Sequence, residues 1–408
     1  MEVKKIVIIT TGQPATNPRA VKEATALHSA GYDVHFIYSF WADWAVPFDR
    51  EIIEKNSGIQ WKLVGGDPFE NRFLWAYSRV RHKLSRWLSK SMKSNLTLAR
   101  NAASRTGFAL IKAATGIKAD LYIAHNLGAL PAAAVASCKH RSPYAFDAED
   151  FHRGQELPDS MEQKRATLLE DNYIPRTVYV SSASPLIADA YRHLYNKEPL
   201  VINNVFSKVF LASVIKKTEL PIKLFWFSQT IGKGRGLEDI VRALGDMPKG
   251  SFTLTLIGSC SDFVKQYFIQ LANIGTTKVE IIFQQPVSVE ELFLLAAKHD
   301  VGLALEQPGE LNRDLCLTNK IFTYLLAGNA IIFTDTSAQA AFFNAHPAIG
   351  ALYRCGNIFD LQNTLKALLN VSSVHQMKQE AAKLAGDVFN WEKESEKLIS
   401  KIREVLKN

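Results

Sequence analysis

Cysteine is scarce in this sequence. The chain of 408 residues has four cysteines, and none belongs to a CxxC pair, so neither a zinc-ligating cluster nor a disulfide scaffold is indicated. No stretch reaches the ~20 apolar residues of a membrane span, and the N-terminus lacks a signal-peptide pattern. These absences predict a cytoplasmic protein with four reduced, packed thiols: Cys138, Cys260, Cys316 and Cys355.

Two common nucleotide-binding fingerprints are also missing. Gly12 follows the first apolar run without the further glycines of GxGxxG, so a nicotinamide cofactor is not indicated. The cluster Gly232-Lys-Gly-Arg-Gly236 lacks the order of a P-loop. It still presents Lys233 and Arg235 between a predicted strand and a helix, which favours an anionic ligand; a solvated turn with incidental charge is the alternative.

The composition is that of an ordinary globular protein. Hydrophobic residues make up 47% and charged residues 22%, and the length suits two or three domains. The formal net charge is +8, and most of this excess lies in the first half, where residues 1–200 carry 26 Lys/Arg and 20 Asp/Glu.

Short β-branched runs alternate with segments of helical period along almost the whole chain. This alternation is typical of parallel strands joined by crossover helices, so the fold class is α/β with two Rossmann-like, doubly wound domains facing across a cleft. The predicted strands are residues 5–11, 33–39, 120–125, 144–148, 177–182 and 200–203, then 223–227, 253–257, 279–283, 301–305 and 330–334.

The segment 207–221 has no clear period and ends in proline, so we place the linker there. This gives an N-terminal domain over 1–205 and a C-terminal domain over 206–390. The amphipathic, charged final segment 391–408 is a separate helix that can pack back on the N-terminal domain. A further short helix is predicted from Thr318 to Gly328, and its N-terminus with Lys320 could hold a phosphate.

The glycine cluster and the 318–328 segment resemble motifs of the GT-B glycosyltransferases, especially family four. The run Phe227 to Ile240 resembles the strand, loop and helix that open their donor domain, and Thr318 to Ile332 resembles their "pNKxxEYxxaGxPvi" segment. The similarity continues through Asn17 to Glu23, Ala30 to Tyr32, Asp120 to Asn126, Val180 to Ser182 and Val201 to Asn204, in the same order along the chain.

This resemblance implies a retaining, metal-independent transfer of a sugar from a nucleotide diphosphate sugar, and the lack of an Asp-x-Asp motif agrees with it. No cofactor is expected beyond this donor substrate. Arg235 corresponds to the basic residue that contacts the donor diphosphate, and Gln229 stands where many relatives have arginine. The expected donor-binding residues are Gly12, Gln229, Lys233, Arg235, Gly258, Val287, Glu306, Asn319, Lys320 and Thr323.

The sequence departs from the family at a pair of glutamates eight residues apart, whose positions hold Leu315 and Thr323. Thr323 could still offer a hydroxyl, and Asp314, Glu310 or Glu306 could replace the first carboxylate. The departure leaves the identity of the donor open.

On the acceptor side, His125 ends a predicted strand and matches a histidine that relatives keep near the transferred sugar. We expect it to form a hydrogen bond to a sugar hydroxyl or to the acceptor. The alternative is a histidine whose hydrogen bonds are satisfied inside the wall of the cleft. Glu149 and Asp150, with Asp147 and His152, follow the next strand and could supply a general base, although helix capping and solvation also explain an acidic loop. The expected catalytic residues are His125, Glu149 and Asp150, and no metal site is expected.

A basic segment runs from Arg72 to Lys118, with eleven Lys/Arg and no Asp or Glu. Its first part has aromatic and aliphatic residues at helical spacing, namely Phe73, Tyr77, Val80, Leu84, Trp87 and Leu88. Such a helix can lie on an anionic membrane, or its apolar face can pack on the domain. No nucleic-acid-reading motif accompanies it, so nucleic acid is not an expected partner. The cations assigned to a membrane or acceptor patch are Arg79, Arg81, Arg86 and Lys90.

Together these features predict a cytoplasmic glycosyltransferase, peripheral at the inner face of the membrane, that transfers a sugar to a glycan or lipid-linked acceptor. Its product would be a cell-surface polysaccharide such as lipopolysaccharide. Two alternatives remain: a nucleotide-sugar epimerase, and a non-catalytic protein that binds sugar nucleotides.

Overall fold

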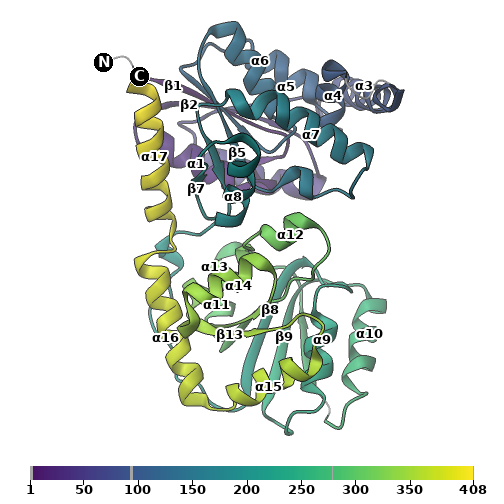
Figure 1. The fold of residues 1–408 in the computed structure, drawn as a ribbon, viewed down its shortest axis with the longest axis vertical. Helices are drawn as coiled ribbons and strands as arrows, with labels where there is room; N and C mark the ends of the chain where they lie inside the picture. Colours follow the sequence, from purple (N-terminus) through teal and green to yellow (C-terminus); the bar gives the residue numbers. More distant parts are fainter. Residues whose placement is uncertain (1–2, 92–94, 278, 408) are drawn as a thin grey trace. The chain divides into compact units, whose positions relative to one another are not determined.

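The computed structural model describes residues 3–91, 95–277 and 279–407 and divides the chain into two compact units (Figure 1). Unit 1 comprises residues up to Ile202 together with the chain from Ser395 onward, and unit 2 comprises Asn203–Glu394. The last helix, α17 (Trp391–Lys407), therefore begins in unit 2 and ends in unit 1. None of the helices in the described ranges is both long and apolar enough to cross a bilayer.

Unit 1 is built on a parallel sheet of seven strands in the order β3-β2-β1-β4-β5-β6-β7. Ile6, Val7, Ile8 and Ile9 of β1 are completely buried, because the central strand of a doubly wound sheet is covered on both faces. The strands are β1 (Lys5–Thr10), β2 (Asp33–Ser39), β3 (Gln60–Val64), β4 (Leu121–His125), β5 (Tyr144–Ala148), β6 (Val180–Ser182) and β7 (Leu200–Val201).

The helices of unit 1 begin at recognisable sequence signals. In α1 the side chain of Asn17 accepts a hydrogen bond from the amide of Ala20, and Pro18 occupies the first helical position. The helices are α1 (Pro18–Ser29), α2 (Val46–Lys55), α3 (Arg72–Ser91), α4 (Leu96–Ala103), α5 (Gly107–Ala114), α6 (Leu130–His140), α7 (Met161–Tyr173) and α8 (Pro185–Tyr195).

Unit 2 is built on a parallel sheet of six strands in the order β10-β9-β8-β11-β12-β13. One contiguous apolar cluster, which includes Leu224, Leu254 and Ile332, joins its strands to the flanking helices. The strands are β8 (Ile222–Thr230), β9 (Phe252–Ser259), β10 (Glu280–Gln284), β11 (Val301–Ala304), β12 (Ala330–Thr334) and β13 (Gly350–Tyr353). The helices are α9 (Leu237–Leu244), α10 (Asp262–Ala272), α11 (Val289–Ala296), α12 (Leu311–Leu315), α13 (Asn319–Ala327), α14 (Ser337–Ala345), α15 (Ile358–Leu368) and α16 (Val371–Asp387).

These sheets confirm the predicted α/β class with two doubly wound units. Each sheet reverses its strand order once, between β1 and β4 in unit 1 and between β8 and β11 in unit 2. Ligands of such sheets bind outside the carboxyl ends of the strands at this reversal. Two strands, β3 and β13, were not expected from the sequence; both lie at an edge of their sheet.

Candidate functional site

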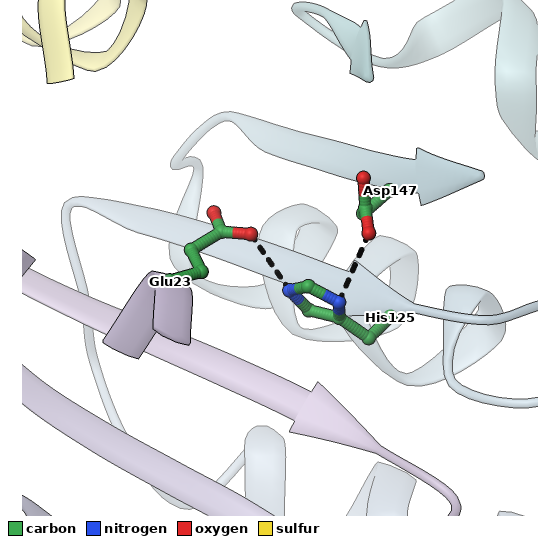
Figure 2. A group of neighbouring side chains, drawn as sticks. All are labelled: Glu23, His125 and Asp147. Atoms are coloured by element: carbon green, nitrogen blue, oxygen red, sulfur yellow. Dashed lines mark ion pairs between the residues drawn. The ribbon is translucent and has the colours of Figure 1, made fainter. Parts of the chain in front are cut away.

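A buried imidazole occupies the end of β4 in unit 1. His125 is the last residue of the strand, and none of its surface is exposed. Its Nε2 lies 2.8 Å from Oε2 of Glu23, which comes from α1, and its Nδ1 lies 3.1 Å from Oδ2 of Asp147 on β5 (Figure 2). The two carboxylates therefore face opposite nitrogens of one ring.

Arg19, one helical turn before Glu23, binds the same carboxylate of Asp147. Its Nε and Nη2 donate to the two oxygens of Asp147 at 2.6 and 2.8 Å, and its Nη1 donates to the carbonyl of Ile202 at 2.7 Å. The hydroxyl of Ser181 donates to Asp147 at 2.6 Å. A bidentate guanidinium is the strongest common partner of a buried carboxylate.

These contacts fix the charges of the cluster. Burial alone would lower the pKa of His125, but Glu23 and Asp147 outweigh it and hold the pKa well above its ordinary value. For Asp147 burial works in the opposite sense, yet Arg19 and His125 hold its pKa well below the usual range. The imidazole is therefore an imidazolium between two carboxylates, and it has no free lone pair with which to act as a base.

Glu23, His125 and Asp147 could also be considered as a metal site, since their ligand atoms lie within 4.8 Å of one another. A metal ion would take only one of the two ring nitrogens, and it would compete with Arg19 for Asp147. Protonation gives both carboxylates a countercharge at once and adds to the positive charge that Arg19 already supplies. The donor set fits a buried imidazolium better than a metal ion.

Glu149 connects this cluster to an open pocket. Its Oε1 lies 3.2 Å from Nδ1 of His125 and accepts a hydrogen bond of 2.6 Å from Asn17, while about a quarter of the side chain, 23%, remains exposed. It lines a pocket of about 350 Å³, which we call the acidic pocket. The other charged or titratable residues of the lining are Asp150, His152, Glu156, Glu162 and Arg165.

The acidic pocket is lined by polar groups of several kinds. Nδ1 of His152 lies 3.2 Å from the amide oxygen of Gln155, whereas its Nε2 is buried without a hydrogen-bond partner among the described residues. The amide of Gln155 donates to Asp150 at 2.9 Å, and the hydroxyl of Thr11 donates to Asn126 at 2.9 Å. Hydroxyl, amide and carboxylate groups arranged around one small pocket suit a ligand with several hydroxyls.

Of the three expected catalytic residues, Glu149 and Asp150 line this pocket, but His125 lies behind Glu149 and is fully buried. Gly12 lies in the loop after β1, where an added Cβ would stand 2.8 Å from the hydroxyl of Thr16. Gly12 thus belongs to unit 1, while the other expected donor-binding residues belong to unit 2.

In unit 2 the loop after β8 contains the glycine cluster 232–236, which we call the glycine-rich loop. The guanidinium of Arg235 donates to the hydroxyl of Ser228 at 2.8 Å, and Arg235 is otherwise exposed. The ammonium of Lys233 lies 3.8 Å above the ring of Tyr267, so this cation turns toward α10. The amide of Gly234 donates to Glu238 at 3.0 Å.

Close backbone contacts join this loop to the neighbouring strand ends. Gly236 has φ +76°, and a Cβ there would lie 2.9 Å from Cβ of Leu305, which directly precedes Glu306. Gly258 on β9 has φ +155°, and a Cβ would lie 2.6 Å from the carbonyl of Ser228. Glycine is required at both positions, and together they bring the ends of β8, β9 and β11 to one place.

Glu306 and Lys320 form an ion pair of 3.3 Å, with 18% and 16% of their side chains exposed. Lys320 lies in the first turn of α13, whose N-terminus has no side-chain cap, and the hydroxyl of Thr318 there is buried without a partner among the described residues. Asn319 next to it is exposed. An uncapped helix start beside a lysine is suited to an anion.

Three other expected donor-binding residues make no described contact with this ion pair. Thr323 is fully buried, and its hydroxyl donates to the carbonyl of Asn319 at 3.0 Å, so it offers no group at the surface. Gln229 is exposed near the end of β8, and Val287 lies half-buried in the loop before α11. No described contact joins these two to the Glu306 pair.

Helix α3 lies at the outside of unit 1 and packs chiefly on α4 (Figure 1). Its apolar face points outward: Phe73 is 95% and Trp87 66% exposed, and Tyr77, Val80 and Leu84 are exposed beside them. The packed face instead carries the buried residues Ser78, Ser85 and Ser89. The alternative interpretation, in which this apolar face packs on the domain, is therefore wrong. We call the five outward residues the α3 surface.

The cations expected to form a patch beside this surface have different partners. Arg79 lies 3.9 Å above the ring of Trp75, and Arg81 lies 3.7 Å above that of Phe108. Arg86 instead forms an ion pair of 2.6 Å with Glu162. The side chain of Lys90 lies outside the described part of the structure.

Arg19 and Glu23 have no role predicted from the sequence. Both lie on α1 beside Ala20 and Ala24, which face the core, and both are buried. Charged residues four apart on the apolar face of a helix were the available signal, since such residues are seldom buried without a partner.

Taken together, the two parallel sheets with glycine-containing loops at their carboxyl ends define a GT-B fold, as the resemblance implied. Anabaena HepE, solved with UDP and glucose, is 15% identical with a TM-score of 0.68, over 98% of this chain and 100% of that one. Sucrose-phosphate synthase from Thermosynechococcus elongatus is 14% identical with a TM-score of 0.70, over 98% and 99%.

The lipopolysaccharide outer core galactosyltransferase WaaB is a further structural relative, 15% identical with a TM-score of 0.61 over 97% of this chain and 99% of that one. No protein-family model matches the sequence, and no curated protein matches it. The similarity therefore concerns the fold.

Proposed function

We propose that this protein is a retaining, metal-independent glycosyltransferase of the hexosyl type, which moves a sugar from a nucleotide diphosphate sugar to a glycan or lipid-linked acceptor. The observation that carries the proposal is the group of cations and helix amides at the carboxyl edge of the second sheet. The structural relatives add support: HepE has been solved with UDP and with UDP-glucose, and TarM with UDP and alpha-GlcNAc-glycerol.

The donor diphosphate would lie between the glycine-rich loop and the start of α13. Arg235 can leave Ser228 for a stronger, charge-assisted bond to a phosphate, and Lys320 can do the same from Glu306. As the bond to the sugar breaks, negative charge develops on the leaving diphosphate, and fixed positive groups stabilise it. Glu306, released from Lys320, would be available to a hydroxyl of the donor.

The acceptor would occupy the acidic pocket of unit 1. Its carboxylates and amides accept and donate hydrogen bonds to hydroxyl groups, and Glu149 is the carboxylate that the buried cluster holds in place. In this proposal His125 is a positioning residue, because its imidazolium touches Glu149 rather than the pocket. The product class would be a cell-surface polysaccharide, including lipopolysaccharide.

The donor site can be tested by thermal denaturation with UDP-, GDP-, ADP- and dTDP-sugars, since a ligand that binds only the folded state raises the melting temperature. We expect one base to stabilise the protein, and Arg235→Ala to remove most of this shift. Arg242→Ala, an exposed arginine on α9, is the matched control. No shift with any donor, or equal shifts in both variants, would contradict this site. A shift without release of the nucleoside diphosphate on addition of acceptors would instead favour a non-catalytic binding protein.

We further propose that the protein works at an anionic membrane surface. The α3 surface exposes aromatic and aliphatic side chains, and cations flank it, which suits the interface of an anionic bilayer. Sedimentation with vesicles of anionic and of neutral lipid measures this. Phe73→Ser with Trp87→Ser should reduce the bound fraction at least tenfold, whereas the exposed Phe359→Ser of unit 2 should not change it. Equal binding by the parent, the double variant and the Phe359→Ser control would show that the α3 surface is not the membrane-binding element.

A further inference from the structure

A second cavity of unit 1, about 530 Å³ in volume, lies between β3, α3 and α5. We call it the α3 cavity. Its size is within the usual range of small-molecule sites, ~300–1,000 Å³. It is distinct from the acidic pocket, and neither the fold nor the proposed reaction accounts for it.

The walls of the α3 cavity are largely apolar. Leu63 comes from β3, Leu74 and Tyr77 from α3, and Phe108 and Ala109 from α5. The four large side chains are each between 38% and 52% exposed, so they remain in contact with solvent although they lie together. Binding of a hydrocarbon chain in such a cavity is favourable, because it removes apolar surface from water.

The charged lining of the same cavity is entirely positive. Lys62, Arg81, Arg105 and Lys112 line it, and none of the described lining residues is Asp or Glu. None of these four forms an ion pair with another described residue; Arg81 and Arg105 lie instead above the rings of Phe108 and Trp41, at 3.7 and 4.4 Å. Cations without carboxylate partners leave a positive potential at the cavity.

His82, also in the lining, is consistent with this field. Burial is the main cause that lowers its pKa, and the nearby Arg86 and Arg105 lower it further. Its Nε2 lies 3.1 Å from the carbonyl of Ala102, which fixes α3 against α4.

Close backbone contacts place the start of α3 beside the cavity. Gly65 and Gly66 adopt φ +79° and +71°, and a Cβ on Gly66 would lie 2.5 Å from the carbonyl of Asn71. The hydroxyl of Ser78 donates to the carbonyl of Gly65 at 3.1 Å. Two left-handed glycines therefore let α3 begin directly beside the end of β3.

We propose that the α3 cavity binds the phosphate and the first carbons of a lipid phosphate. The phosphate would contact Arg81 and Arg105, and the chain would lie along Leu63, Leu74 and Phe108 before it leaves toward the α3 surface. Consecutive residues at the end of α4 line the two sites, Ala103 the acidic pocket and Ser104 the α3 cavity. The role of this lipid as the carrier of the acceptor rests on the proposed glycosyl transfer; the binding itself does not.

The test uses the full chain and geranyl monophosphate below its critical micelle concentration, so that no membrane is present. We expect saturable binding by calorimetry. Arg81→Gln with Arg105→Gln should weaken it at least tenfold, and so should Ala109→Phe, which fills the cavity. Lys83→Gln, an exposed lysine of α3 outside the lining, should stay within twofold.

Several results would overturn the proposal. Unchanged binding in both lining variants would place the lipid elsewhere. Equal competition by inorganic phosphate would reduce the site to an anion site, and equal binding of geraniol would reduce it to an apolar cavity. Because the arginine variant changes only surface groups, it remains informative if Ala109→Phe unfolds the protein.

The same proteins separate this proposal from the proposed function. If geranyl monophosphate does not bind but a nucleotide sugar still raises the melting temperature, only the assignment of the α3 cavity is rejected. Lipid binding without any shift by a nucleotide sugar would reject the glycosyl transfer and leave the cavity assignment intact.

Discussion

The buried imidazolium at the end of β4 predicts how the stability of unit 1 depends on pH. The pKa of His125 is raised in the folded protein, so the folded state holds a proton that the unfolded chain releases above its ordinary pKa of ~6.5. This stabilisation is complete below about pH 6.5 and is lost as the pH rises toward the folded pKa. Within that window the free energy of unfolding should fall by about 1.4 kcal/mol per pH unit for this one proton.

The perturbation is His125→Gln, which keeps an amide between Glu23 and Asp147 but cannot bind a proton. Urea denaturation at pH 7, 7.5, 8 and 8.5, followed by fluorescence, gives the slope of stability against pH; five of the seven tryptophans are in unit 1. We expect the slope of the variant to be less negative than that of the parent by about 1.4 kcal/mol per pH unit.

His35→Gln is the matched control in the same unit. Burial lowers the pKa of His35, so this residue is mostly neutral in both states above pH 7 and should contribute little slope there. If His125→Gln and the parent have the same slope, then the ring is neutral in the folded protein and the assignment of an imidazolium is wrong.

Three further predictions concern unit 2. Lys378→Met leaves Asp300, its partner at 2.8 Å, buried without a countercharge; we expect a loss of about 3–5 kcal/mol in chemical denaturation, and a loss below about 1 kcal/mol would contradict the pairing. Gly236→Ala forces a side chain into φ +76° against Leu305, and should lower stability by at least about 1 kcal/mol, which thermal denaturation measures. Thr323→Val removes only a buried hydroxyl bonded within its own helix, so donor affinity should stay within twofold; a larger loss would show that this hydroxyl reaches the donor.

The fold could be predicted from the sequence because buried parallel strands have continuous apolar runs in the sequence. Residues 33–39, 144–148 and 330–334 were expected as strands with the observed bounds. The strand β3, with the sequence QWKLV, was missed because an edge strand exposes one side, and three of its five residues are exposed. β13 is also an edge strand but has no exposed residue; at four residues, GALY, it is too short to show a clear period.

The candidate site could be predicted only in part, because the sequence shows which residues follow a strand but not which way they face. The loop carboxylates at 149 and 150 do line a pocket, as expected for residues after β5. The burial of His125 depends on Glu23 and Arg19, which come from a different element. Similarly, the amphipathic pattern of α3 gave the two faces of the helix without indicating which one packs.

The orientation of α3 also has a consequence for local stability. A helix of 20 residues normally gains most of its stability from an apolar face in contact with the core, whereas α3 packs through serines and leaves Phe73, Tyr77 and Trp87 largely exposed. Its amide hydrogens should therefore exchange with solvent far faster than those of β1 and β4, since opening the helix exposes little additional apolar surface. Contact of its outward face with any apolar phase would slow that exchange, and this would make α3 the part of unit 1 whose order depends most on its surroundings.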